Sequence, residues 1–399
     1  MAGPGGKKTG PMISFDDALS RLRSAVSPLG AEDVPLADAH GRVLADPVRA
    51  ASDAPFWDVA TMDGYAVAGE GDAFAAIGRA LPGRAFDRAI GEGEAVRIFT
   101  GAPVPAGTAK VVPQEVVARD GDTVRLLAPS PERFIRARAS DFAAGDTLLS
   151  GGTRLGARAL VAAAAADQAS VRCVRRPRLR LLATGDEIAP PGSARDRPGA
   201  IPDSISLAVL ALARDWGAEA VAALRRPDDL PQLVREAPAL LAGADILVVS
   251  GGASVGERDF GKAMFGDALD LLFAVVRIKP GKPVWLGRTG GTWVVGLPGN
   301  PTSALVTARL ILVPLITALL GRDPDVALAW EPLPVASDLP GGGDRETFSR
   351  ARADAGVLHL LPNQDSGAQH MLAAADWLVR RPAGAKGVRA GEIVPALRF

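Results

Sequence analysis

The chain has 399 residues, and its 45 basic side chains balance its 45 acidic ones at a formal net charge of +0. This length exceeds one typical domain and predicts three or four. The balanced charge argues against nucleic acid as the main partner, because such proteins usually carry a basic excess. The single cysteine, Cys173, excludes an intrachain disulfide or a cysteine-based metal site and favours a cytoplasmic location.

The apolar stretches predict a buried core and no membrane span. Residues 1–12 contain glycine, lysine and proline and lack the apolar core of a signal peptide. Leu305–Leu320 is the best candidate for a span, but it is too short and contains Arg309 and Pro314. Because it also follows a glycine loop directly, we expect a helix buried inside a globular domain.

The N-terminal part predicts a capped helix followed by a β-rich insertion. Ser14 can cap a helix whose apolar positions recur at helical spacing up to Leu22. Val34–Leu44 predicts a short strand, a turn at His40-Gly41 and a returning strand. Short β-type runs divided by glycine and proline then predict an all-β insertion; they are Ala95–Thr100, Lys110–Val117 and Thr123–Leu127.

The remainder of the chain alternates between strand and helix patterns. An alanine-rich helix is expected at Leu155–Ala169, and Pro177 lies in a plausible boundary. Alternating strands and helices predict a parallel, doubly wound sheet. Its expected strands are Leu179–Ala183, Ala218–Leu224 and Ile246–Ser250, and its expected helices run from Ser204 to Trp216 and over Leu230–Leu241. Prolines, glycines and short strands such as Val357–Leu361 follow.

These patterns predict a multidomain α/β protein with four domains. A mixed N-terminal domain combines residues 13–45 and 141–175, and a β-rich insertion domain spans residues 46–140. A doubly wound α/β domain occupies residues 176–323, and a small C-terminal β-domain occupies residues 324–399.

The expected ligand site lies at one edge of the doubly wound sheet. Ligands of such sheets bind at the carboxyl ends of the strands. Glycine loops follow the apolar runs that contain Ala183, Val249 and Val295, so all three loops should lie at this edge. Glycines let backbone N–H groups approach an anion. The loops therefore predict a site for a phosphorylated ligand.

Charged residues near these loops suggest how such a ligand is held. Glu257 and Asp259 follow the second loop and offer carboxylates to a hard cation such as Mg²⁺. Lys279 and Lys282 lie in a hairpin-like Lys-Pro-Gly-Lys-Pro segment and add positive charge. The competing interpretation is that the carboxylates cap a helix and that the lysines are solvated turn charges.

Six motifs in one order resemble the molybdopterin molybdenumtransferase family, the MoeA and gephyrin E-domain group, over nearly all of residues 13–399. The motifs are Thr61-Met62-Asp63-Gly64-Tyr65-Ala66, Thr100-Gly101-Ala102-Pro103, Thr184-Gly185-Asp186-Glu187, Gly251-Gly252-Ala253-Ser254-Val255-Gly256-Glu257, Lys279-Pro280-Gly281-Lys282-Pro283 and Pro298-Gly299-Asn300-Pro301. Any one motif alone is weak, whereas six in order are specific.

The resemblance implies an activity and an assembly. Members of this family take adenylylated molybdopterin and molybdate, insert the metal at the dithiolene and release AMP with the help of Mg²⁺. The resemblance also implies a homodimer in which the β-insertion of one chain completes the site of the other. Transient contact with other molybdenum cofactor biosynthesis proteins is expected as well.

The resemblance also implies site residues. Catalytic roles fall on the carboxylates Asp63, Glu187, Asp228 and Asp259, of which Glu187 and Asp259 are the expected metal ligands. Substrate-binding roles fall on Thr100, Asp141, Asp203, Ser204, Gly251, Gly252, Ser254, Gly256, Lys279, Lys282, Pro298, Asn300, Pro301, Arg350 and Ser366.

Several of these residues also have a structural interpretation. Asp63 and Thr100 could simply form turns, and Asp141 could form a surface ion pair worth little. Asp203, Ser204 and Asp228 could serve only as helix-start residues.

Two other functions fit parts of the chain. A molybdopterin adenylyltransferase would use the same α/β domain, but residues 46–140 and 326–399 would then have no obvious purpose. ATP consumption in place of AMP release would identify it. A gephyrin-like scaffold without enzymatic activity is the second alternative. We expect no appended scaffolding domain or long linker, which disfavours it.

Overall fold

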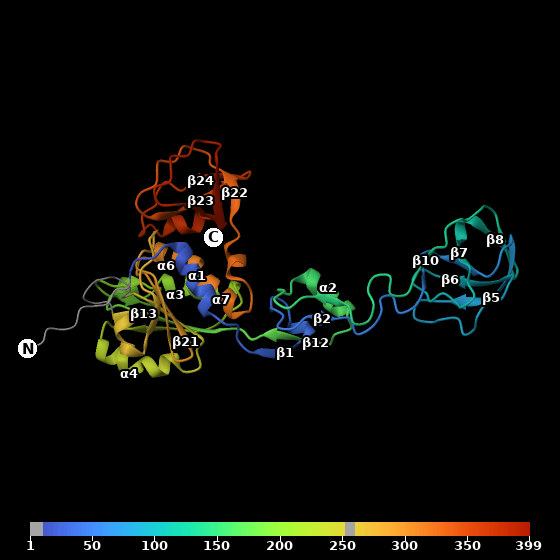
Figure 1. Cartoon of the computed structure of the whole chain (residues 1–399), viewed down its shortest axis with the longest axis horizontal. Coiled ribbons are helices and arrows are strands. Elements are labelled where there is room, and N and C mark those ends of the chain that lie inside the picture. Colours follow the sequence, from blue (N-terminus) through green and yellow to red (C-terminus); the bar gives the residue numbers. More distant parts are fainter. Residues whose placement is uncertain (1–10, 252–259) are drawn as a thin grey trace, which may run out of the picture. The chain divides into compact units, whose positions relative to one another are not determined.

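The computed structural model describes residues 11–251 and 260–399 (Figure 1). They form two compact units, each of which is described by itself. The larger unit comprises residues 11–32, 41–45, 173–251 and 260–399, and the smaller unit comprises Asp33–His40 and Asp46–Arg172. Both units mix helices and sheets, and the expected multidomain α/β class is confirmed.

A six-stranded sheet forms the centre of the larger unit. Its strand order is β16 (Glu219–Arg226), β13 (Arg178–Thr184), β17 (Ile246–Ser250), β21 (Thr292–Leu297), β20 (Trp285–Thr289) and β18 (Asp270–Phe273). The first four strands are parallel, as predicted. Strand β20 runs antiparallel to both of its neighbours, β21 and β18, which corrects the expectation of a wholly parallel sheet. Only Gly290 and Gly291 separate β20 from β21, and so short a turn joins antiparallel strands.

Helices cover both faces of this sheet, which confirms the doubly wound arrangement. In β17, Ile246 and Val248 point into one core, and Leu247 and Val249 point into the other. The first core includes α1 (Phe15–Ala25), α3 (Ile205–Asp215), α6 (Pro301–Thr307), η5 (Ala308–Leu312) and α7 (Val313–Leu319). The second includes α4 (Leu230–Leu241) and the residues around α5 (Phe260–Ala263).

The apolar run after Pro301 is a core helix. Pro301–Leu319 is long and apolar enough to cross a membrane, yet 94% of its most apolar stretch is buried within the protein. Its single cation, Arg309, lies 4.9 Å from the ring centre of Trp216 and donates hydrogen bonds to the carbonyl oxygens of Arg398 and Ala327. Burial lowers the pKa of Arg309 to about 10. The expected buried helix is confirmed.

A second sheet of the larger unit is built mainly from the C-terminal residues. Its order is β19 (Ile278–Lys279), β23 (Glu346–Asp354), β25 (Trp377–Arg381), β26 (Ile393–Arg398) and β22 (Glu331–Pro334), and β24 (Val357–Leu360) also pairs with β23. Ile278 and Lys279 pair in parallel with Glu346 and Thr347. The Lys279–Pro283 segment therefore begins in an edge strand of this sheet and then turns. Across the turn the Val276 N–H donates to the carbonyl oxygen of Lys282, which agrees with the predicted hairpin-like segment, whereas the pairing with β23 was not predicted.

The smaller unit contains a third six-stranded sheet, which confirms the β-rich insertion. Its order is β7 (Lys110–Pro113), β4 (Gly64–Val67), β6 (Glu94–Ile98), β5 (Ala73–Ala80), β9 (Thr123–Leu126) and β8 (Val117–Asp120). In β4, Ala66 packs into one core while Tyr65 and Val67 pack into another. Shorter strands form two further pairs, β2 (Val48–Arg49) with β11 (Thr147–Leu149) and β3 (Val59–Ala60) with β10 (Ile135–Arg136). The alanine-rich helix α2 (Ala157–Ala165) is shorter than predicted.

The segment 34–44 has the predicted turn at His40-Gly41, but the extended stretches on its two sides pair with β12 (Ser170–Val174) and not with each other as predicted. Leu36–Asp38 forms a 3₁₀ turn, and the Leu36 N–H donates to the carbonyl oxygen of Ala169. Leu44 instead forms a β-bridge with Cys173. The apolar pattern correctly indicates extended chain, but it carries no information about a pairing partner so far along the sequence.

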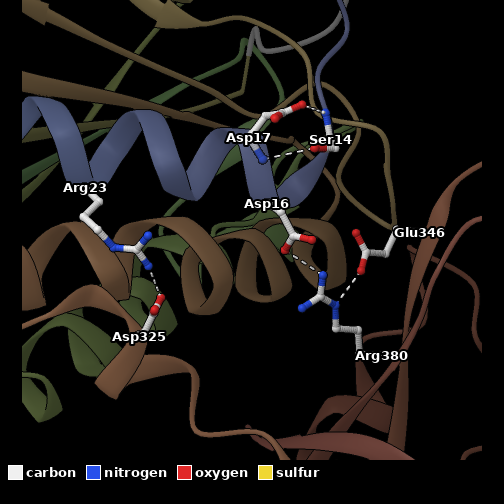
Figure 2. A network of polar contacts seen from close by, with 7 residues as sticks. All are labelled: Ser14, Asp16, Asp17, Arg23, Asp325, Glu346 and Arg380. Atoms are coloured by element: carbon white, nitrogen blue, oxygen red, sulfur yellow. Dashed lines mark hydrogen bonds and ion pairs between the residues drawn. The ribbon is translucent and has the colours of Figure 1, made fainter.

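Helix α1 is fixed at its start by a capping box (Figure 2). The Ser14 hydroxyl accepts the Asp17 N–H, and the Asp17 carboxylate accepts the Ser14 N–H, which confirms the predicted cap. The helix is then held to the C-terminal sheet by Arg380 of β25. This guanidinium donates to Asp16 and Glu346 and lies 5.3 Å from the ring centre of Phe15.

The Arg380–Glu346 pair is largely buried, whereas Asp16 and the second ion pair of α1 are exposed. Burial lowers the pKa of Arg380, but its hydrogen bonds to Glu346 and Asp16 outweigh this effect and raise the pKa overall. The side chain of Glu346 is only 12% exposed. Arg23 pairs with Asp325, and their side chains are 45% and 61% exposed (Figure 2).

We expect Arg380→Met to lower the free energy of unfolding by about 3–5 kcal/mol, because Glu346 would stay buried without its cation. The matched control, Arg23→Met, should change it by less than about 1 kcal/mol, the range for an exposed pair. Urea unfolding followed by circular dichroism measures both variants. Equal losses would contradict the stabilising role of Arg380.

Candidate functional site

Three neighbouring strands of the central sheet end at the same level. Ala183 of β13 pairs with Ser250 of β17, and Ser250 pairs with Leu297 of β21. The loops that follow these residues therefore begin side by side at the carboxyl edge. This confirms the predicted convergence of the three glycine loops.

A cavity of about 370 Å³ lies at this edge. Its described lining comes from all three strand ends, from the start of α3 and from a loop of the C-terminal sheet. The lining residues are Ala183, Thr184, Glu187, Ile188, Ile201, Pro202, Asp203, Ser204, Ile205, Ser250, Gly251, Gly299, Asn300, Pro301, Gly367 and Gln369. Each of them belongs to the larger unit.

Glycine is required where two of the loops meet. Gly251 has φ +87°, and a Cβ there would lie 2.3 Å from the carbonyl oxygen of Thr184. A Cβ on Gly299 would come within 3.9 Å of the Gly251 Cα atom. Gly251 and Gly299 both line the cavity and present backbone atoms to it without an intervening side chain.

Thr184 adds a polar group that sequence reasoning did not single out. The residue is 4% exposed, and its Oγ1 atom has no hydrogen-bond partner among the residues described. A buried hydroxyl normally has a partner. Because Thr184 lines the cavity, a bound ligand or water can supply it. In the sequence, only its position in the Thr-Gly-Asp-Glu motif could have indicated that Thr184 belongs to the site.

Two cavity carboxylates have different surroundings. Asp203 is 4% exposed; it accepts a hydrogen bond from the Ser206 N–H and a charged one from Arg225 Nε at 2.7 Å. Asp203 therefore supports the first turn of α3, and its charge is neutralised by Arg225. Glu187 is exposed and lines the cavity. Its carboxylate lies close to Gly185, because a Cβ added to that glycine would be 2.9 Å from Glu187 Oε2. Its charge thus remains available to a ligand.

Other expected residues lie beside the cavity. Asp228 donates its backbone N–H to the carboxylate of Asp186, which brings it next to the Glu187 loop but not into the described lining. Ser204 lines the cavity and precedes α3, but the capping hydrogen bond comes from Asp203. Pro298 is buried at the end of β21 and is likewise absent from the described lining.

A loop of the C-terminal sheet forms one wall and is tied to the start of α6. Asn300 donates a hydrogen bond to the Ser366 hydroxyl at 3.0 Å. Arg350 is 1% exposed, and its guanidinium donates to Thr302 Oγ1 and to the carbonyl oxygens of Asn363, Asp365 and Ala368. Burial lowers the pKa of Arg350, opposed by Asp365. Ser366 and Arg350 thus fix the loop whose Gly367 and Gln369 line the cavity.

The two expected lysines are exposed and do not contribute to the described lining. Lys279 belongs to β19, and Lys282 lies in the turn that follows this strand. Gly281 between them packs against α6, since a Cβ there would lie 2.1 Å from Thr307 Cγ2. The segment is therefore held against the helix that begins at the cavity, and Gly281 has a structural reason to be glycine.

The smaller unit brings two expected residues together and leaves a third apart. Asp63 accepts hydrogen bonds from both the N–H and the hydroxyl of Thr100, each at 2.8 Å. These bonds lower the pKa of Asp63. Asp141 is exposed, and its N–H donates to the carbonyl oxygen of Ala54. Thr100 thus fixes the orientation of the Asp63 carboxylate and favours its ionised form.

Four expected site residues, Gly252, Ser254, Gly256 and Asp259, lie outside the described residues, as does Glu257. In the part that is described, no group of three His, Cys, Asp or Glu side chains is arranged to hold a metal ion. Mg²⁺ commonly binds through one or two carboxylates together with substrate phosphates. The exposed carboxylate of Glu187 at the cavity fits that requirement.

Comparison with known proteins identifies the family. The MoeA N-terminal region (domain I and II) matches residues 13–166, a probable molybdopterin binding domain matches residues 180–318, and the MoeA C-terminal region (domain IV) matches residues 332–399. A molybdopterin molybdenumtransferase of Nostoc sp. is 31% identical over 98% of this chain and 94% of its own. Molybdopterin molybdenumtransferase 2 of Mycobacterium tuberculosis is 33% identical over 90% and 92%.

A solved structure agrees with these sequence matches. The molybdopterin biosynthesis MoeA protein of Pyrococcus horikoshii has a TM-score of 0.85 and 28% identity over 98% of this chain and 99% of its own. Most of the cavity's described lining lies in the segment that matches a probable molybdopterin binding domain, and Gly367 and Gln369 come from the C-terminal match. The curated relatives are enzymes of the transferase class. The chain belongs to the molybdopterin molybdenumtransferase (MoeA) family.

We expect Gly251→Ala to destabilise the protein more than Gly266→Ala. Both glycines have positive φ, but the added Cβ meets no atom within 4 Å at Gly266. The control should lose about 1–2 kcal/mol from the left-handed conformation. Gly251→Ala should lose about 1–3 kcal/mol more, because Thr184 must move to remove the overlap. Thermal melting of both variants measures this, and equal melting temperatures would show that the two loops can separate freely.

Proposed function

We propose that this enzyme inserts molybdenum from molybdate into adenylylated molybdopterin and releases AMP. The observation that carries this proposal is the cavity at the ends of three parallel strands, most of whose described lining belongs to the segment that matches a probable molybdopterin binding domain. Relatives named molybdopterin molybdenumtransferase match this chain over most of its length. The N- and C-terminal matches to MoeA regions favour this activity over that of an adenylyltransferase.

The cavity supplies groups suited to a phosphorylated ligand. Backbone atoms at Gly251 and Gly299 and the hydroxyl of Thr184 can contact phosphate oxygens. Asn300, held by Ser366, orients the loop before α6. Glu187 would hold Mg²⁺, which supplies charge neutralisation on the phosphates during cleavage of the pyrophosphate bond.

We expect Glu187→Gln to reduce AMP release from adenylylated molybdopterin and molybdate by about 10²–10³-fold, the range for losing one electrostatic contact to a transition state. The control Asp196→Asn removes a carboxylate that is 76% exposed and lies outside the described lining. Stopped assays that quantify AMP compare both variants with the wild type. Normal release by Glu187→Gln would refute its role, and ATP consumption by the wild type would favour the adenylyltransferase.

We further propose that a homodimer completes the site, with Asp63 and Thr100 of one chain serving the cavity of the other. The support is that both residues lie in resembling site motifs within the insertion, far in sequence from the glycine loops. Their hydrogen bonds keep the Asp63 carboxylate anionic and oriented. A two-fold interface makes such an exchange reciprocal. A cytoplasmic location remains a prediction from the sequence.

A mixed dimer tests this proposal. One chain carries Asp63→Asn and the other carries Glu187→Gln, with different affinity tags for purification. If sites combine residues of two chains, each purified mixed dimer has one intact site and should show about half of the wild-type rate. If sites form within one chain, every site has a substitution and no rescue occurs. Sedimentation that shows only monomer at micromolar protein would also refute the proposal.

A further inference from the structure

A smaller apolar cavity opens beside the main one. It has a volume of about 160 Å³ and lies between α3, α6 and η7 (His370–Ala374). Four residues line both cavities, namely Ser204, Ile205, Pro301 and Gln369. The residues that line only the smaller one are Ala208, Val209, Leu305 and Leu372. We call this space the annex.

The walls of the annex are apolar faces of two helices. Ile205, Ala208 and Val209 share one face of α3, because they are three and four residues apart. Pro301 and Leu305 share one face of α6 by the same spacing. Val209 is fully buried, but Ile205, Ala208 and Leu305 remain partly exposed. The main core therefore leaves apolar surface uncovered at this point.

The mouth of the annex is polar. Gln369 precedes η7 and makes no side-chain capping bond to it. Its amide has no hydrogen-bond partner within the described parts of the chain, and it lines both cavities. An amide offers donors and an acceptor together. It can therefore meet a group whose edge carries both nitrogen acceptors and N–H donors.

The size and chemistry of the annex select its occupant. Its volume is several times the ~30 Å³ that one water occupies in the liquid, but it is less than half of the main cavity. Apolar walls disfavour a phosphate, which would be desolvated there without a partner. A ligand with an uncharged ring in the annex and an attached phosphorylated group in the main cavity fits both.

We propose that the annex binds a fused nitrogen heterocycle of the substrate, edge-on to Gln369, while the phosphorylated part occupies the main cavity. This inference rests on the proposed function, since adenylylated molybdopterin has two such ring systems, a pterin and an adenine. Both ring systems have faces that can contact the apolar walls of the annex and nitrogen-bearing edges that can form hydrogen bonds with Gln369. The ring thereby sets the position of the phosphate next to Glu187.

Binding measurements on annex variants test the proposal. Ala208→Phe fills the annex, and Ala211→Phe makes the same change at an exposed position of the same helix. The probes are AMP followed by calorimetry, 6-hydroxymethylpterin followed by its fluorescence, and inorganic pyrophosphate as a ligand without a ring. We expect Ala208→Phe to weaken one ring probe by about tenfold or more, whereas pyrophosphate affinity and the control stay unchanged.

A second variant tests the proposal even if Ala208→Phe does not fold. Leu372→Ala removes apolar contact without adding bulk, and it should weaken the same ring probe in the same direction. Loss of AMP affinity alone identifies the adenine, and loss of pterin affinity alone identifies the pterin. Unchanged binding of both probes in Ala208→Phe and Leu372→Ala overturns the proposal, as does wild-type protein that binds neither probe or an equal loss in Ala211→Phe. AMP release by the wild type reports separately on the proposed function.

Discussion

The in-register ends of β13, β17 and β21 are the constraint on which the site depends. Ala183, Ser250 and Leu297 lie next to one another, so the three loops after them must share one edge. Such crowding leaves no space for a side chain at Gly251, and it buries the hydroxyl of Thr184 beside the loops. Helices α3 and α6 begin at the same edge, because α3 follows the segment after β13 and α6 follows the loop after β21. The register of the sheet thus determines where a ligand can bind.

The C-terminal sheet turns this open edge into a cavity. Its loop around Ser366 carries backbone carbonyl groups that would be costly to bury without donors. Arg350 satisfies three of them and also reaches Thr302 of α6, so one buried cation joins the loop to the helix. Arg380 provides a second attachment, between α1 and the same sheet. The shape of the ligand site therefore depends on residues far from the glycine loops in sequence.

Sequence patterns predicted the parts that local chemistry determines. The bounds of β17 and α4 match the predicted ones, because apolar periodicity marks them clearly, although the residue that caps α4 is Asp229 and not the expected Asp228. The location of the cavity at the carboxyl edge of the sheet, and of Gly251 in its lining, agrees with the predicted alternation of strands, glycine loops and helices. Pairing partners were not predictable: β19 joins a sheet built from distant residues, and Leu44 pairs with Cys173. Gln369 lines the cavity without any local motif, so its role emerges only from the tertiary structure.

The charge balance of the cavity constrains how an anionic ligand can bind. No lysine or arginine appears in its described lining, and Arg225 is already committed to Asp203. Glu187 contributes a carboxylate without a described cation, so phosphates placed beside it would meet repulsion in a partly enclosed space. A cation held between Glu187 and the phosphates removes that repulsion and makes the carboxylate favourable. The Mg²⁺ that we propose would therefore account for an acidic residue in the proposed site for a polyanion, and binding there need not rely on a basic surface.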